Sequence, residues 1–183
     1  MKRPWQKLRF TRGKGYWLFG KPPVPTVMYD DVDLTLIPKD AQAVAGYVGG
    51  RWPTFSKLRA LFPGARKFVS IAVNASEDAD ILDIENGDAT NVQAAVWFKR
   101  QTARRPGFYT SVSNVAALVD TLSRAGIPRS AYRLWTAHYT DTPHLCSSTC
   151  YRGMPTTADA TQYTDHALGR NLDASVVSPA FFS

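Results

Sequence analysis

The chain alternates short apolar runs with segments whose apolar residues recur every three or four positions. The apolar runs predict strands over residues 26–30, 43–48, 67–73, 79–85, 107–110, 132–138, 158–163 and 171–175. The helical spacing predicts helices over residues 54–62, about 90–103 and 113–125. Thr90 suits the cap of the second helix, and Gly126 suits the end of the third.

This order of elements is typical of the α/β class. Strands that alternate with helices pair in parallel through right-handed crossovers, and about eight strands favour a closed barrel over an open sheet. A full eightfold barrel takes about 250 residues, whereas this chain has 183. We therefore predict a shortened TIM-like β/α barrel whose helices are poorly developed after the later strands.

The charge divides the chain into two parts. Residues 1–21 hold seven Lys and Arg and no acid, whereas residues 22–183 hold 15 basic and 15 acidic residues. We predict a basic, aromatic extension with a proline-rich hinge over residues 1–25, followed by a barrel domain over residues 26–183. The extension suits an anionic polymer, a phage virion or a membrane surface, unless its aromatic side chains simply pack on the domain. Nucleic acid is disfavoured as a partner because the barrel segment carries no net charge.

Polar residues gather where the predicted strands end, which is where such barrels place their reacting groups. Residues 79–85 alternate apolar and acidic side chains, so Asp83 and Glu85 share one face of a strand. Two neighbouring carboxyl groups that are shielded from water repel one another when both are ionised. One of them therefore tends to stay protonated at neutral pH. Such a pair can cleave a glycosidic bond, with one group as the acid. Acidic strand ends also cap helices or bind Mg²⁺ or Ca²⁺, and this alternative stays open.

Five segments occur in the order seen in family 25 glycoside hydrolases, namely residues 82–85, 108–110, 134–139, 161–164 and 171–175. The chain resembles these lysozyme-type muramidases of phages and bacteria, which have a shortened β/α barrel and cleave the glycan strands of peptidoglycan. Residues 43–48, 84–90 and 158–164 look more closely like an actinobacterial and actinophage branch of glycoside-hydrolase-like proteins. The likeness covers residues 26–178.

The resemblance implies a role for each matching residue. Glu85 would be the general acid, and Asp83 would orient the substrate's acetamido group or stabilise the developing cation. Asp30 or Asp31 would complete the acidic floor together with Asp173. The predicted catalytic residues are thus Glu85, Asp83, Asp173 and Asp30, and the predicted substrate-binding residues are Asp31, Asp88, Tyr109, Trp135, Tyr139 and Gln162.

The two cysteines, Cys146 and Cys150, lie close together in one polar segment. Their spacing favours a small disulfide loop over free thiols. A metal site ranks last, because His138 and His144 would both have to converge on the cysteines. We therefore expect neither a metal nor a cofactor.

These observations lead to two hypotheses. The first is an endolysin-like hydrolase of bacterial cell-wall glycan, of phage or bacterial origin. The second is a catalytically inert barrel that binds glycan or forms part of a virion. No run of about 18 apolar residues is present to span a bilayer, and no Sec signal is evident. We therefore expect the protein at the host cell wall or outside the cell after release by another route, or in the virion.

Overall fold

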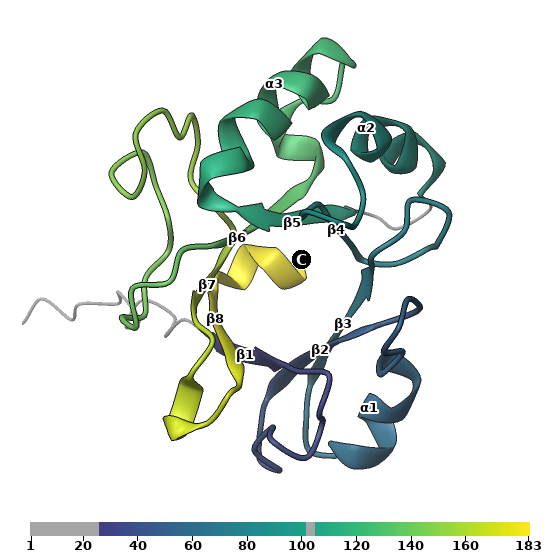
Figure 1. The fold of residues 1–183 in the computed structure, drawn as a ribbon, viewed down its shortest axis with the longest axis vertical. Helices are drawn as coiled ribbons and strands as arrows, with labels where there is room; N and C mark the ends of the chain where they lie inside the picture. Colours follow the sequence, from purple (N-terminus) through teal and green to yellow (C-terminus); the bar gives the residue numbers. More distant parts are fainter. Residues whose placement is uncertain (1–25, 102–104) are drawn as a thin grey trace, which may run out of the picture.

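The computed structural model describes residues 26–101 and 105–183 and shows a closed barrel of eight strands in the order β1 to β8 (Figure 1). The strands are β1 (Thr26–Asp30), β2 (Ala43–Tyr47), β3 (Lys67–Ala72), β4 (Ile81–Asp83), β5 (Gly107–Ser111), β6 (Arg133–Ala137), β7 (Ala160–Thr164) and β8 (Asp173–Val177). The predicted barrel is confirmed. The basic extension over residues 1–25 lies outside the described residues. Among the described residues, no helix combines the length and hydrophobicity needed to cross a membrane.

The last strand departs from the predicted parallel arrangement. Strands β1 to β7 pair in parallel with their neighbours, whereas β8 pairs antiparallel with both β7 and β1. The cause lies in the connection from β7 to β8, which is a short loop with one 3₁₀ turn (Ala167–Gly169). A parallel crossover needs a dozen residues or more, so the chain can only turn back. The first residue of β8 therefore lies beside the last residue of β1.

Helices cover only part of the barrel wall (Figure 1). α1 (Phe55–Leu61) lies outside β2 and β3, whereas α2 (Asn91–Arg100) and α3 (Val115–Arg124) lie outside β4 and β5. Between β6 and β7, residues 138–159 form a long loop with neither helix nor strand. The weak helix signal in the later part of the chain thus corresponds to a wall covered by a loop.

The barrel interior is apolar at one end and polar at the other. The apolar end lies away from the carboxyl ends of the parallel strands and is filled by side chains such as Met28, Ile71, Ile81 and Val177. A C-terminal 3₁₀ turn (Pro179–Phe182) lies across that end (Figure 1). Because successive strand residues point to opposite faces, the next inward positions toward the carboxyl ends of the parallel strands are also buried. Those positions carry the polar residues of the candidate site.

The capping box of α2 provides a test of local structure. The Thr90 hydroxyl accepts a hydrogen bond from the Gln93 N–H at 3.3 Å, and the Gln93 side chain accepts one from the Thr90 N–H at 2.9 Å. We expect Thr90→Ala to lower the free energy of unfolding by about 1 kcal/mol, because the Gln93 N–H loses the hydroxyl that accepts its hydrogen bond. Urea unfolding measures the change. Thr157→Ala, at an exposed loop position, serves as the control, and equal stability of the two variants would contradict the prediction.

Candidate active site

A cavity of about 110 Å³ opens at the carboxyl ends of the parallel strands. Its lining residues come from all eight strands and from the segments after β4 and β6: Asp30, Tyr47, Ile71, Asp83, Glu85, Tyr109, Trp135, Tyr139, Gln162 and Asp173. All four residues predicted as catalytic therefore lie in one cavity, together with four of the six predicted to bind substrate.

The carboxyl groups of this cavity differ in depth. Asp30 and Asp83 are buried, with exposed fractions of 3% and 5%, whereas Glu85 is exposed at the mouth. Strand β4 ends at Asp83, two residues earlier than predicted, so Glu85 belongs to the segment that follows the strand. Asp173, the first residue of β8, lies opposite Asp30 in the antiparallel register. The reversal of β8 is what brings this fourth carboxyl group to the carboxyl ends of the other strands.

The surroundings of these groups favour their protonated forms. Burial raises the pKa of Asp83 to about 8, and the charges of Glu85 and Asp88 add to this effect. Burial likewise raises the pKa of Asp173 to about 7. The pKa of Asp30 rises well above its ordinary value, through burial first and then through the charge of Asp173. The pKa of Glu85 is raised as well, by burial and then by Asp88. At neutral pH the cavity thus holds carboxyl groups that can donate protons.

Among the described residues, no basic side chain forms an ion pair with this cluster. Within residues 26–101 and 105–183, the ion pairs of Arg and His involve Asp78, Asp80, Asp120, Asp159 and Asp165, and all of these aspartates lie outside the cavity lining. One side-chain oxygen of Asp30 and one of Asp83 are also buried without a hydrogen-bond partner among the described residues. Buried oxygens of this kind are costly unless a ligand or water satisfies them. The arrangement is that of a binding cavity rather than of a set of structural salt bridges.

A hydrogen-bonded row of side chains from β5, β7 and the segment after β6 lines the cavity next to the acids. The Tyr109 hydroxyl donates to Gln162 Oε1 at 2.5 Å, and Gln162 Nε2 donates to the Tyr139 hydroxyl at 3.2 Å. Trp135 packs edge-on against Tyr109 with ring centroids 4.8 Å apart, and its Nε1 donates to Ser175 Oγ at 3.0 Å. These contacts fix the orientation of an amide and two phenols, groups that can hydrogen-bond to sugar hydroxyls.

Two predicted substrate-binding residues lie beside the cavity. Asp31 does not line it, because its Oδ1 accepts a hydrogen bond from the Asp33 N–H at 2.6 Å. Asp88 lines two adjoining hollows, of about 280 and 580 Å³, that also contain Glu85. Glu85 therefore lies where the deep cavity meets a longer surface depression.

Two residues of this depression were not predicted from the sequence. Tyr47, the last residue of β2, lines both the deep cavity and the hollow of about 280 Å³. Trp52 is exposed in the same hollow, with the Arg51 guanidinium 5.0 Å from its ring centroid. Strand-end position was a signal that could have identified Tyr47. Trp52 follows a Gly-Gly turn, and no periodic pattern indicates its direction.

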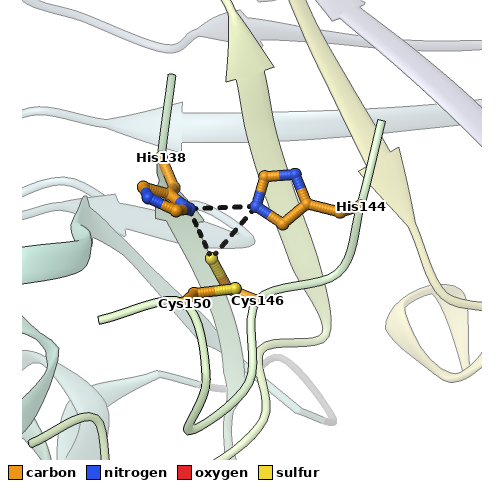
Figure 2. Close-up of side chains that lie close together, drawn as sticks. All are labelled: His138, His144, Cys146 and Cys150. Carbon is orange, nitrogen blue, oxygen red and sulfur yellow. Dashed lines mark hydrogen bonds between the residues drawn. The ribbon is translucent and has the colours of Figure 1, made fainter. Parts of the chain in front are cut away.

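The structure differs from the predicted disulfide. Cys146 and Cys150 are free thiols, and Cys146 Sγ faces ring nitrogens of His138 and His144 at 3.3 and 3.5 Å. Figure 2 shows the two cysteines and the two histidines gathered in one cluster. The convergence of the histidines, which the sequence alone did not predict, is therefore present.

Comparisons with known proteins support the fold. No protein-family model and no curated protein sequence matches the chain. Among solved structures, an uncharacterized protein of B. stearothermophilus matches with a TM-score of 0.60 at 14% identity, over 85% of this chain and 97% of that one. A family GH25 lysozyme from Aspergillus fumigatus matches with a TM-score of 0.55 at 13% identity, over 87% and 100%.

A third structure, the spore cortex lytic enzyme SleM of Clostridium perfringens, has a TM-score of 0.48 at 16% identity, over 87% of this chain and 69% of that one. At such identities a structural likeness establishes the fold alone. The chain thus has a barrel of the kind found in a GH25 lysozyme.

Asp83 should make stability depend on pH. The folded state keeps the Asp83 proton up to about pH 8, whereas an ordinary aspartate releases it near 3.8. Between these values the folded state binds more protons, so the free energy of unfolding falls as the pH rises. In Asp83→Asn, we expect the free energy of unfolding to fall less steeply with pH. At pH 8 the variant should be more stable than the wild type by roughly 2 kcal/mol.

Urea unfolding between about pH 5 and pH 8 measures this difference. Asp78→Asn is the matched control, because the Asp78 side chain is 82% exposed. A pH dependence of Asp83→Asn equal to that of the wild type would show that the buried carboxyl group is not the cause.

Proposed function

We propose that the protein hydrolyses the glycan strands of bacterial peptidoglycan, as a lysozyme-type muramidase. The observation that carries this proposal is a cavity of carboxyl groups that have no basic partner among the described residues, on a barrel similar to that of a GH25 lysozyme. Glycosidic bonds are cleaved by paired Asp or Glu residues, one of which must be protonated when the substrate binds. The raised pKa values of Asp83, Glu85 and Asp173 meet that requirement.

Glu85 is assigned as the general acid. It lies at the mouth, where the deep cavity joins the surface depression, and a glycan strand lying in the depression would bring a glycosidic oxygen to it. Its raised pKa keeps a larger fraction of the carboxyl group protonated near neutral pH. The proton passes from Glu85 to the leaving oxygen as the bond to the anomeric carbon breaks.

Asp83 is assigned as the group that interacts with the sugar whose anomeric carbon becomes positively charged. This carboxyl group lies deeper than Glu85, and one of its oxygens is buried without a partner among the described residues. It can therefore accept a hydrogen bond from an acetamido N–H or stabilise the developing cation. Asp30 and Asp173 line the same cavity, and the charge of Asp173 is one of the causes that raise the pKa of Asp30.

The hydrogen-bonded row of Tyr109, Gln162 and Tyr139 is expected to orient the substrate. The row from Tyr109 through Gln162 to Tyr139 offers an amide and hydroxyl groups to the sugar that enters the cavity. A glycan longer than one sugar would extend along the depression that contains Trp52 and Asp88. We further propose that the protein reaches the wall as a phage or actinobacterial product, either released or carried in a virion.

The acid role of Glu85 is tested by a conservative substitution. We expect Glu85→Gln to release new reducing ends from purified actinobacterial cell walls at least about 100-fold more slowly than the wild type, because glutamine has no proton to donate. Glu77→Gln is a matched control, since Glu77 is the chain's other glutamate and lies outside the cavity lining. Equal rates for Glu85→Gln and wild type would overturn the assignment.

A second candidate function is glycan binding without turnover. The exposed ring of Trp52, in the depression next to the acids, is the observation that favours it, because sugar rings stack on exposed aromatic faces. If wild type binds insoluble cell walls and releases no reducing ends, this function replaces the first one.

Trp52 should contribute to binding under either function. We expect Trp52→Ala to weaken the affinity for soluble peptidoglycan fragments by roughly threefold to tenfold, through loss of the stacking surface. Isothermal titration measures the affinity. Val96→Ala removes exposed apolar surface on α2, outside the lining of both hollows, and serves as the control. An unchanged affinity of Trp52→Ala would remove this residue from the binding surface.

A further inference from the structure

The long loop between β6 and β7 is the least regular part of the described barrel. Residues 138–159 contain neither helix nor strand, yet Cys146 and Met154 are buried against the core that α2 and α3 also cover. Connections of this length without secondary structure are uncommon and need some other source of order. A metal ion that joins distant positions of a loop supplies such order.

Four possible metal ligands from this loop converge in space (Figure 2). One ligand atom from each of His138, His144, Cys146 and Cys150 lies within 4.8 Å of all the others. His138 Nδ1 lies 3.0 Å from His144 Nε2, and Cys146 Sγ lies 3.3 and 3.5 Å from these two nitrogens. In a tetrahedral zinc site, two nitrogens lie about 3.3 Å apart, and a nitrogen and a sulfur lie about 3.6 Å apart. The distances among His138, His144 and Cys146 are close to those of such a site, and Cys150 lies within 4.8 Å of all three.

The groups around the cluster orient the two histidines as ligands. His144 Nδ1 lies 2.7 Å from the carbonyl oxygen of Thr142, which can only accept a hydrogen bond, so Nδ1 carries the proton. In the neutral ring, Nε2 then has a free lone pair that points into the cluster. A ring nitrogen that donates to a backbone carbonyl is the usual support of a zinc-bound histidine. The backbone N–H of His138 donates to the carbonyl oxygen of Gln162 at 2.9 Å, which anchors the main chain at His138 to the barrel.

The two sulfur atoms are held in a similar way. The Cys146 N–H donates to the hydroxyl of Thr161 on β7 at 2.8 Å, and this contact fixes the buried cysteine to the barrel wall. Cys150 Sγ accepts a hydrogen bond from the Ser147 N–H at 3.4 Å. Such a bond stabilises a sulfur that carries negative charge, as a metal-bound thiolate does.

We propose that His138, His144, Cys146 and Cys150 bind one Zn²⁺ ion in a structural site. A set of two imidazole nitrogens and two cysteine sulfurs favours zinc over Mg²⁺ or Ca²⁺, which prefer oxygen ligands. Four protein ligands leave no open position for water or substrate, so the ion holds the loop and takes no part in the reaction.

The zinc site also positions one wall of the cavity. His138 directly precedes Tyr139, whose hydroxyl accepts a hydrogen bond from Gln162 Nε2. Zinc therefore restricts the backbone at the point where Tyr139 enters the wall. This role concerns the loop and does not depend on whether the cavity hydrolyses glycan.

Metal analysis of the full chain tests the proposal. Protein expressed with added zinc and dialysed is expected to contain about one zinc per chain by plasma mass spectrometry. His144→Ala and Cys150→Ser are expected to lose most of this zinc. His166→Ala is the matched control, because the third histidine of the chain is exposed and lies outside the cluster. Zinc loss by His166→Ala as large as that of His144→Ala would overturn the proposal.

Two measurements on the wild type keep the test valid if the variants fold poorly. Cobalt bound in place of zinc is expected to give visible absorption of tetrahedral Co²⁺ and a thiolate-to-metal band in the near ultraviolet. Removal of the metal by a chelator is expected to lower the melting temperature by about 5 °C or more, and added zinc is expected to restore it. No bound metal in zinc-supplemented protein, or a Cys146–Cys150 disulfide found by mass spectrometry in freshly purified protein, would overturn the proposal.

Discussion

Desolvation of carboxyl groups inside a closed barrel is the constraint that shapes the candidate site. Every second residue of a strand faces inward, so the β1 and β4 strands that bury Met28 and Ile81 carry Asp30 and Asp83 inward two residues later. At that level both side chains are buried, and the ion pairs of the described residues leave these carboxyl groups without a basic partner. Their raised pKa values follow from this position, because an ionised carboxylate is poorly stabilised there.

The direction of β8 completes the cluster at the same end of the barrel. In an all-parallel barrel, the first residue of the last strand would lie at the opposite end from the carboxyl ends of the others. Because β8 is antiparallel, Asp173 lies opposite Asp30 instead. The short β7–β8 connection thus has a chemical consequence as well as a topological one. It adds a carboxyl group whose charge helps to raise the pKa of Asp30.

The features that the sequence predicts correctly are those that local sequence patterns determine. Strand alternation is sufficient to place Asp83 and Tyr109 inward, because the pleat of a strand does not depend on distant residues. The direction of β8 depends on where the barrel closes, and the convergence of His138 with His144 depends on the path of an irregular loop. Hydrophobic periodicity carries no information about such a path. For the same reason, two cysteines four positions apart favoured a disulfide when only their spacing was considered.

The two halves of the barrel wall are stabilised by different kinds of interaction. Around β2 to β5, helices satisfy their own backbone hydrogen bonds and bury apolar faces such as that of α3. Outside β6 and β7, the loop has no such internal ladder, so its order comes from contacts with the barrel. One of these is the hydrogen bond that the Cys146 backbone N–H donates to the Thr161 hydroxyl. A bound zinc ion would supply four further links on this side. The helix-poor wall is also the one that carries Tyr139 and Gln162 into the cavity. Order in this loop and geometry in the cavity therefore depend on the same short segment after β6.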